Sequence, residues 1–136
     1  MDKKFWIAFV AVFVAGQILD FLIHGVLLTS TYAAQPMGVF RPMDQMNNML
    51  LMVVGLIVSF FLTMIYSKNH EGKGMMEGVR FGLFVGFITA TPMAYATYAT
   101  SPITYSLAMQ WFLYGMIKTI ILGIALSMVY GKPQTA

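Results

Sequence analysis

The sequence predicts an all-α membrane protein, a single transmembrane domain over residues 1–136 in which four helices form a compact bundle. Hydrophobic residues make up 59% of the chain and charged residues only 10%. A water-soluble domain of this size does not need so many hydrophobic residues to form its core. Four apolar stretches each provide the roughly 20 residues that cross about 30 Å of hydrocarbon. These stretches lie near residues 5–30, 47–67, 78–99 and 105–131.

The first stretch opens with MDKKFWIAFVAVFVAG, which resembles a signal peptide because lysines precede an apolar run. Cleavage after Ala15 requires a small residue at the third position before the cut, where Phe13 stands. The apolar run also continues past this point. We therefore expect residues 5–30 to form an uncleaved anchor helix.

Small residues recur every four positions along the second, third and fourth stretches. Lipid tails are as apolar as leucine, so membrane helices associate where small side chains let two backbones approach. We expect the third helix to be the most closely packed, with a bend at Pro92 because proline removes a backbone donor. The ladders are Gly55-Ser59-Thr63, Gly78-Gly82-Gly86-Ala90-Ala94 and Gly115-Thr119-Gly123-Ser127.

The connections are marked by aromatic residues and by prolines. The segment between the first two stretches contains Pro36, Gly38 and Pro42, so it cannot be a continuous helix, and we expect a short structured cap. Tyrosine and tryptophan favour the membrane boundaries. We expect Trp6, Tyr66 and Tyr130 at one boundary and Tyr32, Tyr98, Tyr105 and Trp111 at the other.

Two short motifs recur in the same order along the chain. TYAAQPM at 31–37 returns as TYATSPI at 97–103, and MIYSK at 64–68 returns as MVYGK at 128–132. Ordered matches at nearly equal offsets favour duplication. We predict a duplicated helical hairpin, with copies at about 1–68 and 69–136. Both copies begin on the same side, so the repeat is parallel.

The distribution of positive charge predicts the orientation. The chain termini and the middle loop carry most of it, whereas the first outer connection has only Arg41 and the second has no charge. The positive-inside rule then places both termini in the cytoplasm. The net charge of +3 follows this topology and does not indicate nucleic-acid binding. The cytoplasmic set comprises Lys3, Lys4, Lys68, Lys73, Arg80 and Lys132.

Polar residues inside the apolar stretches form the candidate functional cluster. Gln17, Asp20 and His24 fall within about 60° of one helix face. The other ionisable residue deep in a stretch is Lys118. A rise of 1.5 Å per residue puts Asp20 about 22 Å and Lys118 about 18 Å above the cytoplasmic edge. The two charges can therefore pair if the first and fourth helices are neighbours.

Three roles for this cluster follow from its composition. Asp20 and Lys118 can form an interhelical clamp, to which Gln17 adds a hydrogen bond. They can instead form a proton or ion relay with His24 as an outer gate, since ionisable residues inside membranes often mark such paths. The cluster can also be a pocket for a lipid or quinone head group.

No cofactor or metal is evident from the sequence. The second histidine, His70, lies in the cytoplasmic loop, so a haem held by two histidines is excluded, and His24 could serve only as a single axial ligand to haem or chlorophyll. Methionines at 43, 46, 49 and 52 suggest copper(I). Their spacing sweeps about 180° of a helix, however, and we expect them to fill gaps in the packed interior.

Enzyme motifs are missing: there is no phosphate-binding loop, zinc motif or nucleophile elbow. We expect a non-enzymatic membrane protein, a small accessory subunit or partner-binding module that contacts the lipid bilayer and either other membrane subunits or copies of itself. The alternative is a small transporter or proton-coupled permease that uses Asp20 and Lys118. A weaker third option is a lipid- or quinone-binding membrane enzyme.

The segments DFLIHGVLL, TYAA and GVFRP, followed by EGVRFGLFVG and a fourth apolar stretch, resemble small bacterial inner-membrane proteins with four helices. The resemblance covers most of the chain. It implies a four-helix bundle in a bacterial cytoplasmic membrane. It implies no activity and no site residue.

Overall fold

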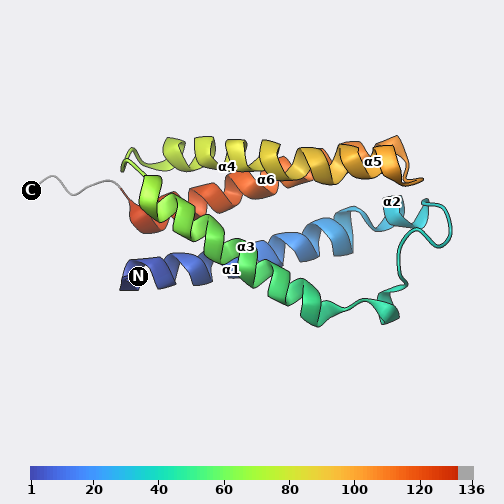
Figure 1. The fold of residues 1–136 in the computed structure, drawn as a ribbon, viewed down its shortest axis with the longest axis horizontal. Coiled ribbons are helices and arrows are strands. Elements are labelled where there is room, and N and C mark those ends of the chain that lie inside the picture. The colour runs from blue at the N-terminus through green and yellow to red at the C-terminus, as the bar shows by residue number, and fades with distance from the viewer. Residues whose placement is uncertain (132–136) are drawn as a thin grey trace, which may run out of the picture.

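The computed structural model describes residues 1–131, which are mostly helical and contain no strand (Figure 1). Lys132, one of the predicted cytoplasmic charges and the last residue of the second MIYSK-type motif, lies outside the described residues. The elements are α1 (Lys3–Leu22), η1 (Ile23–Leu27), α2 (Thr29–Ala33), η2 (Met43–Gln45), α3 (Asn48–Asn69), α4 (Met75–Thr91), η3 (Pro92–Ala96), α5 (Thr97–Thr100) and α6 (Tyr105–Tyr130).

Four helical runs are long and apolar enough to cross a membrane, which confirms the four helices expected from the sequence. Their ends differ from the predicted ones by at most three residues. α1, α3, α4 and α6 alternate in direction. One end of the bundle therefore carries the start of α1 with Lys3 and Lys4 and the α3–α4 connection with Lys68 and Lys73, and the other end carries the long α2–η2 segment. We call these the lysine-rich end and the opposite end. The runs are Lys3–Leu27, Asn48–Asn69, Met75–Thr100 and Tyr105–Tyr130.

Side-chain caps fix where three of the long helices begin. Asp2, Asn47 and Thr104 each accept a hydrogen bond from the backbone N–H three residues later, at 2.9, 2.9 and 3.3 Å. An oxygen in this position satisfies one of the N–H groups that a helix start leaves without a partner. α4 instead follows Gly74, whose φ of 85° favours glycine.

Each hairpin's first helix passes through one π-helical turn near the opposite end. η1 and η3 are both followed by a short α-helical turn that carries the sequence Thr-Tyr-Ala. Pro92 opens η3, where the wider turn keeps the helix continuous although proline offers no N–H. The structure thus has a π turn at Pro92, and the bend expected there stays a prediction. The duplication of the hairpin stays a prediction.

α4 and α6 form the closest helix pair, as the small-residue ladders predict. Gly78, Gly82 and Gly86 are buried. A Cβ atom at Gly82 would lie 2.3 Å from the carbonyl oxygen of Thr119, and one at Gly123 would lie 2.1 Å from the carbonyl oxygen of Gly78. Only glycine allows two backbones to approach to this distance. The interface also includes Gly115, where a Cβ atom would lie 2.9 Å from the Cβ of Ala90.

α1 packs against α6 and also against α3. Ala8 and Val12 of α1 are fully buried beside Leu122 and Leu126 of α6 and beside Tyr66 of α3. Along α3, the side chains on this face are the small residues of its ladder, and they are followed by Tyr66. The buried residues of α3 are Ser59, Thr63 and Tyr66.

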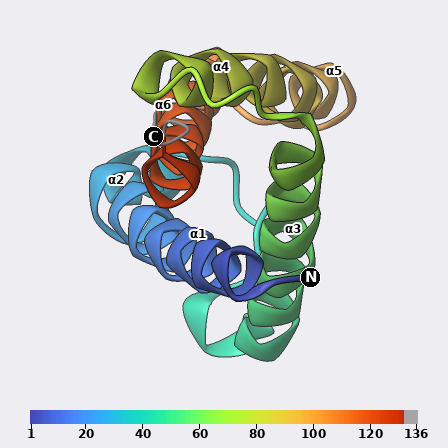
Figure 2. The ribbon, with the colours of Figure 1, turned by 90° about the vertical axis from the view of Figure 1, so that its left-hand side faces the viewer.

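The first half of α3 departs from the compact bundle expected from the sequence. Residues 48–54 are all exposed, and no residue of α3 before Ser59 is buried. Viewed along the helices, α3 stands apart from α4 (Figure 2). The cause is local: the small-residue ladder of α3 begins only at Gly55, and the bulky residues before it offer no face for close helix approach.

Candidate functional site

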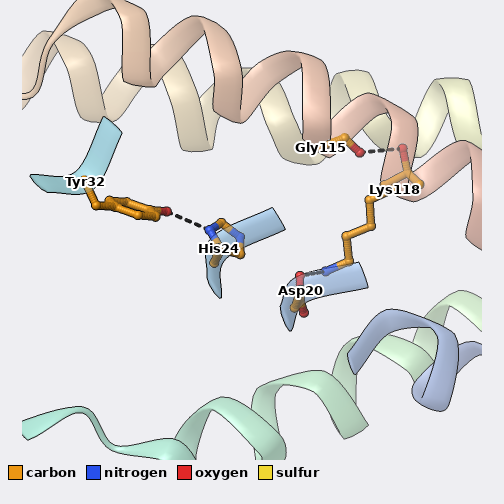
Figure 3. Close-up of polar contacts among 6 residues, drawn as sticks. Asp20, His24, Tyr32, Gly115 and Lys118 are labelled. Atoms are coloured by element: carbon orange, nitrogen blue, oxygen red, sulfur yellow. Dashed lines mark hydrogen bonds and ion pairs between the residues drawn. The ribbon is translucent and has the colours of Figure 1, made fainter. Parts of the chain in front are cut away.

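The Asp20 and Lys118 side chains form an ion pair between α1 and α6, as their matched depths predict. Lys118 Nζ donates to Asp20 Oδ1 at 2.5 Å (Figure 3). The pair is not sealed inside the chain, since 40% of the Asp20 side chain and 27% of the Lys118 side chain remain exposed. Its chemistry suits either a clamp between helices or a proton-accepting site.

His24 lies one helical turn beyond Asp20 and bonds to an aromatic residue. Its Nδ1 is 2.6 Å from the Tyr32 hydroxyl, which also accepts a hydrogen bond from Trp111 Nε1 at 2.8 Å. Burial raises the pKa of Tyr32, against the lowering effect of the Trp111 hydrogen bond, so the hydroxyl keeps its proton. With its proton in place, Tyr32 can either donate to Nδ1 or accept from it, according to the tautomer of His24.

Gln17 does not join the ion pair, so the hydrogen bond expected there is not formed. Its amide lies against α3 instead, where a Cβ atom at Gly55 would be 2.4 Å from Gln17 Nε2. The polar face of α1 and η1 therefore has three neighbours: Gln17 of α1 contacts α3, Asp20 of α1 contacts α6, and His24 of η1 contacts Tyr32 of α2. Gly55 has a different role from the glycines of α4, because it makes room for a polar side chain.

The structure shows a polar network at the opposite end, in which only Tyr32 and Trp111 were expected at a membrane boundary. Tyr32 and Trp111 bond to each other, and Thr31 donates to Gln110 Oε1 at 2.8 Å. Gln35 completes the contact: its amide donates to the Thr104 hydroxyl at 2.9 Å and accepts from the Thr104 N–H at 2.8 Å. One signal was available, since Thr31, Tyr32 and Gln35 share the recurring motif and lie within about one helical turn.

The methionine prediction is wrong. Met43, Met46, Met49 and Met52 are all exposed and do not fill the interior, because they belong to η2, the segment after it and the unpacked half of α3. In residues 1–131, no group of three His, Asp or Glu side chains is placed to hold a metal ion. Since Tyr32 occupies Nδ1 of His24, an axial cofactor ligand could use only Nε2.

Replacing Tyr32 with phenylalanine is expected to destabilise the protein by about 2 kcal/mol. The change leaves His24 Nδ1 and Trp111 Nε1 without their shared partner, and a buried polar group without a partner costs about 1–3 kcal/mol. Unfolding of the purified protein by SDS in mixed micelles, followed by circular dichroism, measures the loss. The matched control is Tyr98→Phe, at the corresponding position of the second TYA motif, where the side chain is 44% exposed. Equal effects of both changes would contradict the role of the network.

Comparisons of this chain with protein-family models, with curated proteins and with solved structures give no match.

Proposed function

We propose that this protein spans a bacterial cytoplasmic membrane four times and acts there as a non-enzymatic, partner-binding subunit of a larger membrane assembly. The charge distribution supports the orientation: Lys3, Lys4, Lys68 and Lys73 all belong to the lysine-rich end, which the positive-inside rule assigns to the cytoplasm. Both termini then lie in the cytoplasm.

The observation that carries the proposal is the exposure of α3 over residues 48–54 on every side. α4 also has an exposed face, but its opposite face is buried against α6, as is usual for a helix at the edge of a bundle. A helix segment with no buried residue gains little stability from packing against its own chain. We propose that a transmembrane helix of another protein packs against this half of α3.

The chemistry of the neighbouring residues indicates what this partner helix carries. Gln17, Asp20 and Lys118 all lie in spanning helices, and the ion pair is partly exposed. An exposed charge in hydrocarbon costs about 3 kcal/mol on insertion scales. A partner helix with a hydroxyl or amide side chain at this depth would supply the missing hydrogen bonds.

The exposed methionines support the proposal that a partner protein binds the first half of α3. Met49 and Met52 lie on the unpacked half of α3, and Met43 and Met46 lie just before it. The flexible, polarisable thioether adapts to different neighbours and is common at protein-binding surfaces.

Site-specific photo-crosslinking in native membranes tests the proposal. A photoreactive amino acid at Val54, on the unpacked half of α3, should give an adduct with a transmembrane helix of a different protein, mapped by mass spectrometry. The same group at Phe84, on the exposed face of α4, is the control and should react with lipid only. Asp20→Asn should weaken the Val54 adduct. Adducts with a second 15.2 kDa copy, or equal adducts from both positions, would overturn the proposal.

A second candidate function is proton-coupled transport. The observation that favours it is the row of polar groups from Lys118 and Asp20 to His24 and Tyr32, which leads from the middle of the helices toward the opposite end (Figure 3). Asp20 would carry the proton and Lys118 would compensate its charge. This role requires Asp20 to titrate, whereas the subunit role does not.

A further inference from the structure

A pocket of about 570 Å³ opens at the lysine-rich end, between the start of α1 and the ends of α3 and α6. We propose that this pocket binds the phosphate headgroup of an anionic phospholipid, a ligand that goes beyond the protein partner proposed above. Its polar lining includes Lys4, Lys68, His70 and Tyr130.

The charge of the lining favours an anion. In residues 1–131 the ion pairs are Lys73 with Glu71 and Lys118 with Asp20, so Lys4 and Lys68 have no carboxylate partner there. Asp2 also lines the pocket and opposes an anion, but its Oδ1 accepts the N–H of Phe5 at the start of α1. Two lysines against one capped carboxylate leave a positive site, the type that binds lipid phosphates at the cytoplasmic ends of helices.

Two buried polar atoms in the lining lack a well-aligned partner within the described part of the chain. His70 Nδ1 is inaccessible and forms no hydrogen bond, and Tyr130 Oη is inaccessible with only the Ser67 hydroxyl of the lining beside it, a rare condition in folded proteins. The His70 ring is held in place, because it stacks on Tyr66 at 5.6 Å and lies 4.7 Å from the Tyr130 ring. Small adjustments of these rings would let a phosphate oxygen accept from both groups.

The position of the pocket favours a lipid over free phosphate. The spanning runs that contribute to it begin at Lys3 or end at Asn69 and Tyr130, so the pocket lies where lipid headgroups meet the bilayer surface. Phe5 and Met64 give the lining an apolar side, which suits a glycerol backbone and the start of an acyl chain and offers nothing to a free anion.

Native mass spectrometry of the detergent-purified chain tests this site with three probes: phosphatidylglycerol, phosphatidylcholine and inorganic phosphate. The test variant is Lys4→Gln with Lys68→Gln. The matched control is Lys3→Gln with Lys73→Gln, which removes the same charge at the same end of the bundle but outside the lining. Circular dichroism and the SDS unfolding midpoint establish that both variants fold. Tyr130→Phe removes one buried donor and no charge.

We expect phosphatidylglycerol to bind the unchanged chain and phosphatidylcholine to bind at least tenfold more weakly. The pocket variant should lose about 30-fold in affinity for phosphatidylglycerol, the factor that two lysines contribute at a membrane surface, and Tyr130→Phe should lose about fivefold. The control variant should lose less than threefold. Equal losses in the pocket and control variants would overturn the site, as would equal binding of both lipids. Phosphate binding that displaces phosphatidylglycerol and matches its affinity would overturn the lipid assignment.

Discussion

Replacing Gly82 with alanine is expected to destabilise the protein by about 3 kcal/mol, the upper range for inserting atoms into a packed interior. The new Cβ would lie 2.3 Å from the carbonyl oxygen of Thr119 and 2.5 Å from the Cα of Ile120. Both obstacles are backbone atoms of α6, so no side chain can rotate away and the two helices must separate. SDS unfolding in mixed micelles measures the loss.

Gly16→Ala is the control for this change. Gly16 is also a buried glycine in one of the four long helices, but a Cβ there would meet no atom within 4 Å. Because alanine is the better helix former by about 1 kcal/mol, Gly16→Ala should leave the protein as stable as before or slightly more stable. A loss at Gly16 as large as that at Gly82 would show that the close contact of α4 with α6 is not the cause.

Replacing Asp20 with asparagine is expected to cost about 2–3 kcal/mol of stability. The change leaves Lys118 charged, partly buried and without the carboxylate that it contacts at 2.5 Å, and removal of one partner from an ion pair away from water is strongly destabilising. The double variant, Asp20→Asn with Lys118→Met, removes the remaining charge as well. It should recover more than half of the lost stability in the same SDS titration.

The same variants separate the clamp from the relay. If the pair is a clamp, the Asp20→Asn variant unfolds more easily than the unchanged protein, and the double variant regains most of the lost stability. A relay requires pH-dependent flux in liposomes to disappear in both variants, although the double variant folds. Flux that survives in a well-folded double variant would exclude the relay, and unchanged stability in Asp20→Asn and in Lys118→Met alone would exclude the clamp.

The parts of the fold that depend on residue size could be predicted from the sequence. Glycines four residues apart in the third stretch indicated its closest contact, and α4 makes that contact through Gly78, Gly82 and Gly86. The depth of each side chain along its helix could be predicted too, because the rise per residue is constant. That rise places Asp20 and Lys118 at similar depths, whichever helices are neighbours.

The parts that depend on what surrounds an apolar residue could not be predicted. Met49 could face lipid, a partner protein or the protein interior. The sequence pattern is the same in all three cases, since hydrocarbon and protein interior are equally apolar. For this reason the exposed half of α3 was missed. Tyr32 and Trp111 were missed for a related reason: both are typical of a membrane boundary, and the pattern does not say whether they meet lipid or each other.

The ion pair has a consequence for the order in which the chain is made. Asp20 and Lys118 are 98 residues apart, and ribosomes add about 5–20 residues per second. In a chain that spans the membrane as proposed, Asp20 would enter it roughly 5–20 s before Lys118 is synthesised. During that interval the first helix would carry a carboxyl group with no counter-charge. A chain that stops before α6 would therefore leave Asp20 without its partner inside the bilayer.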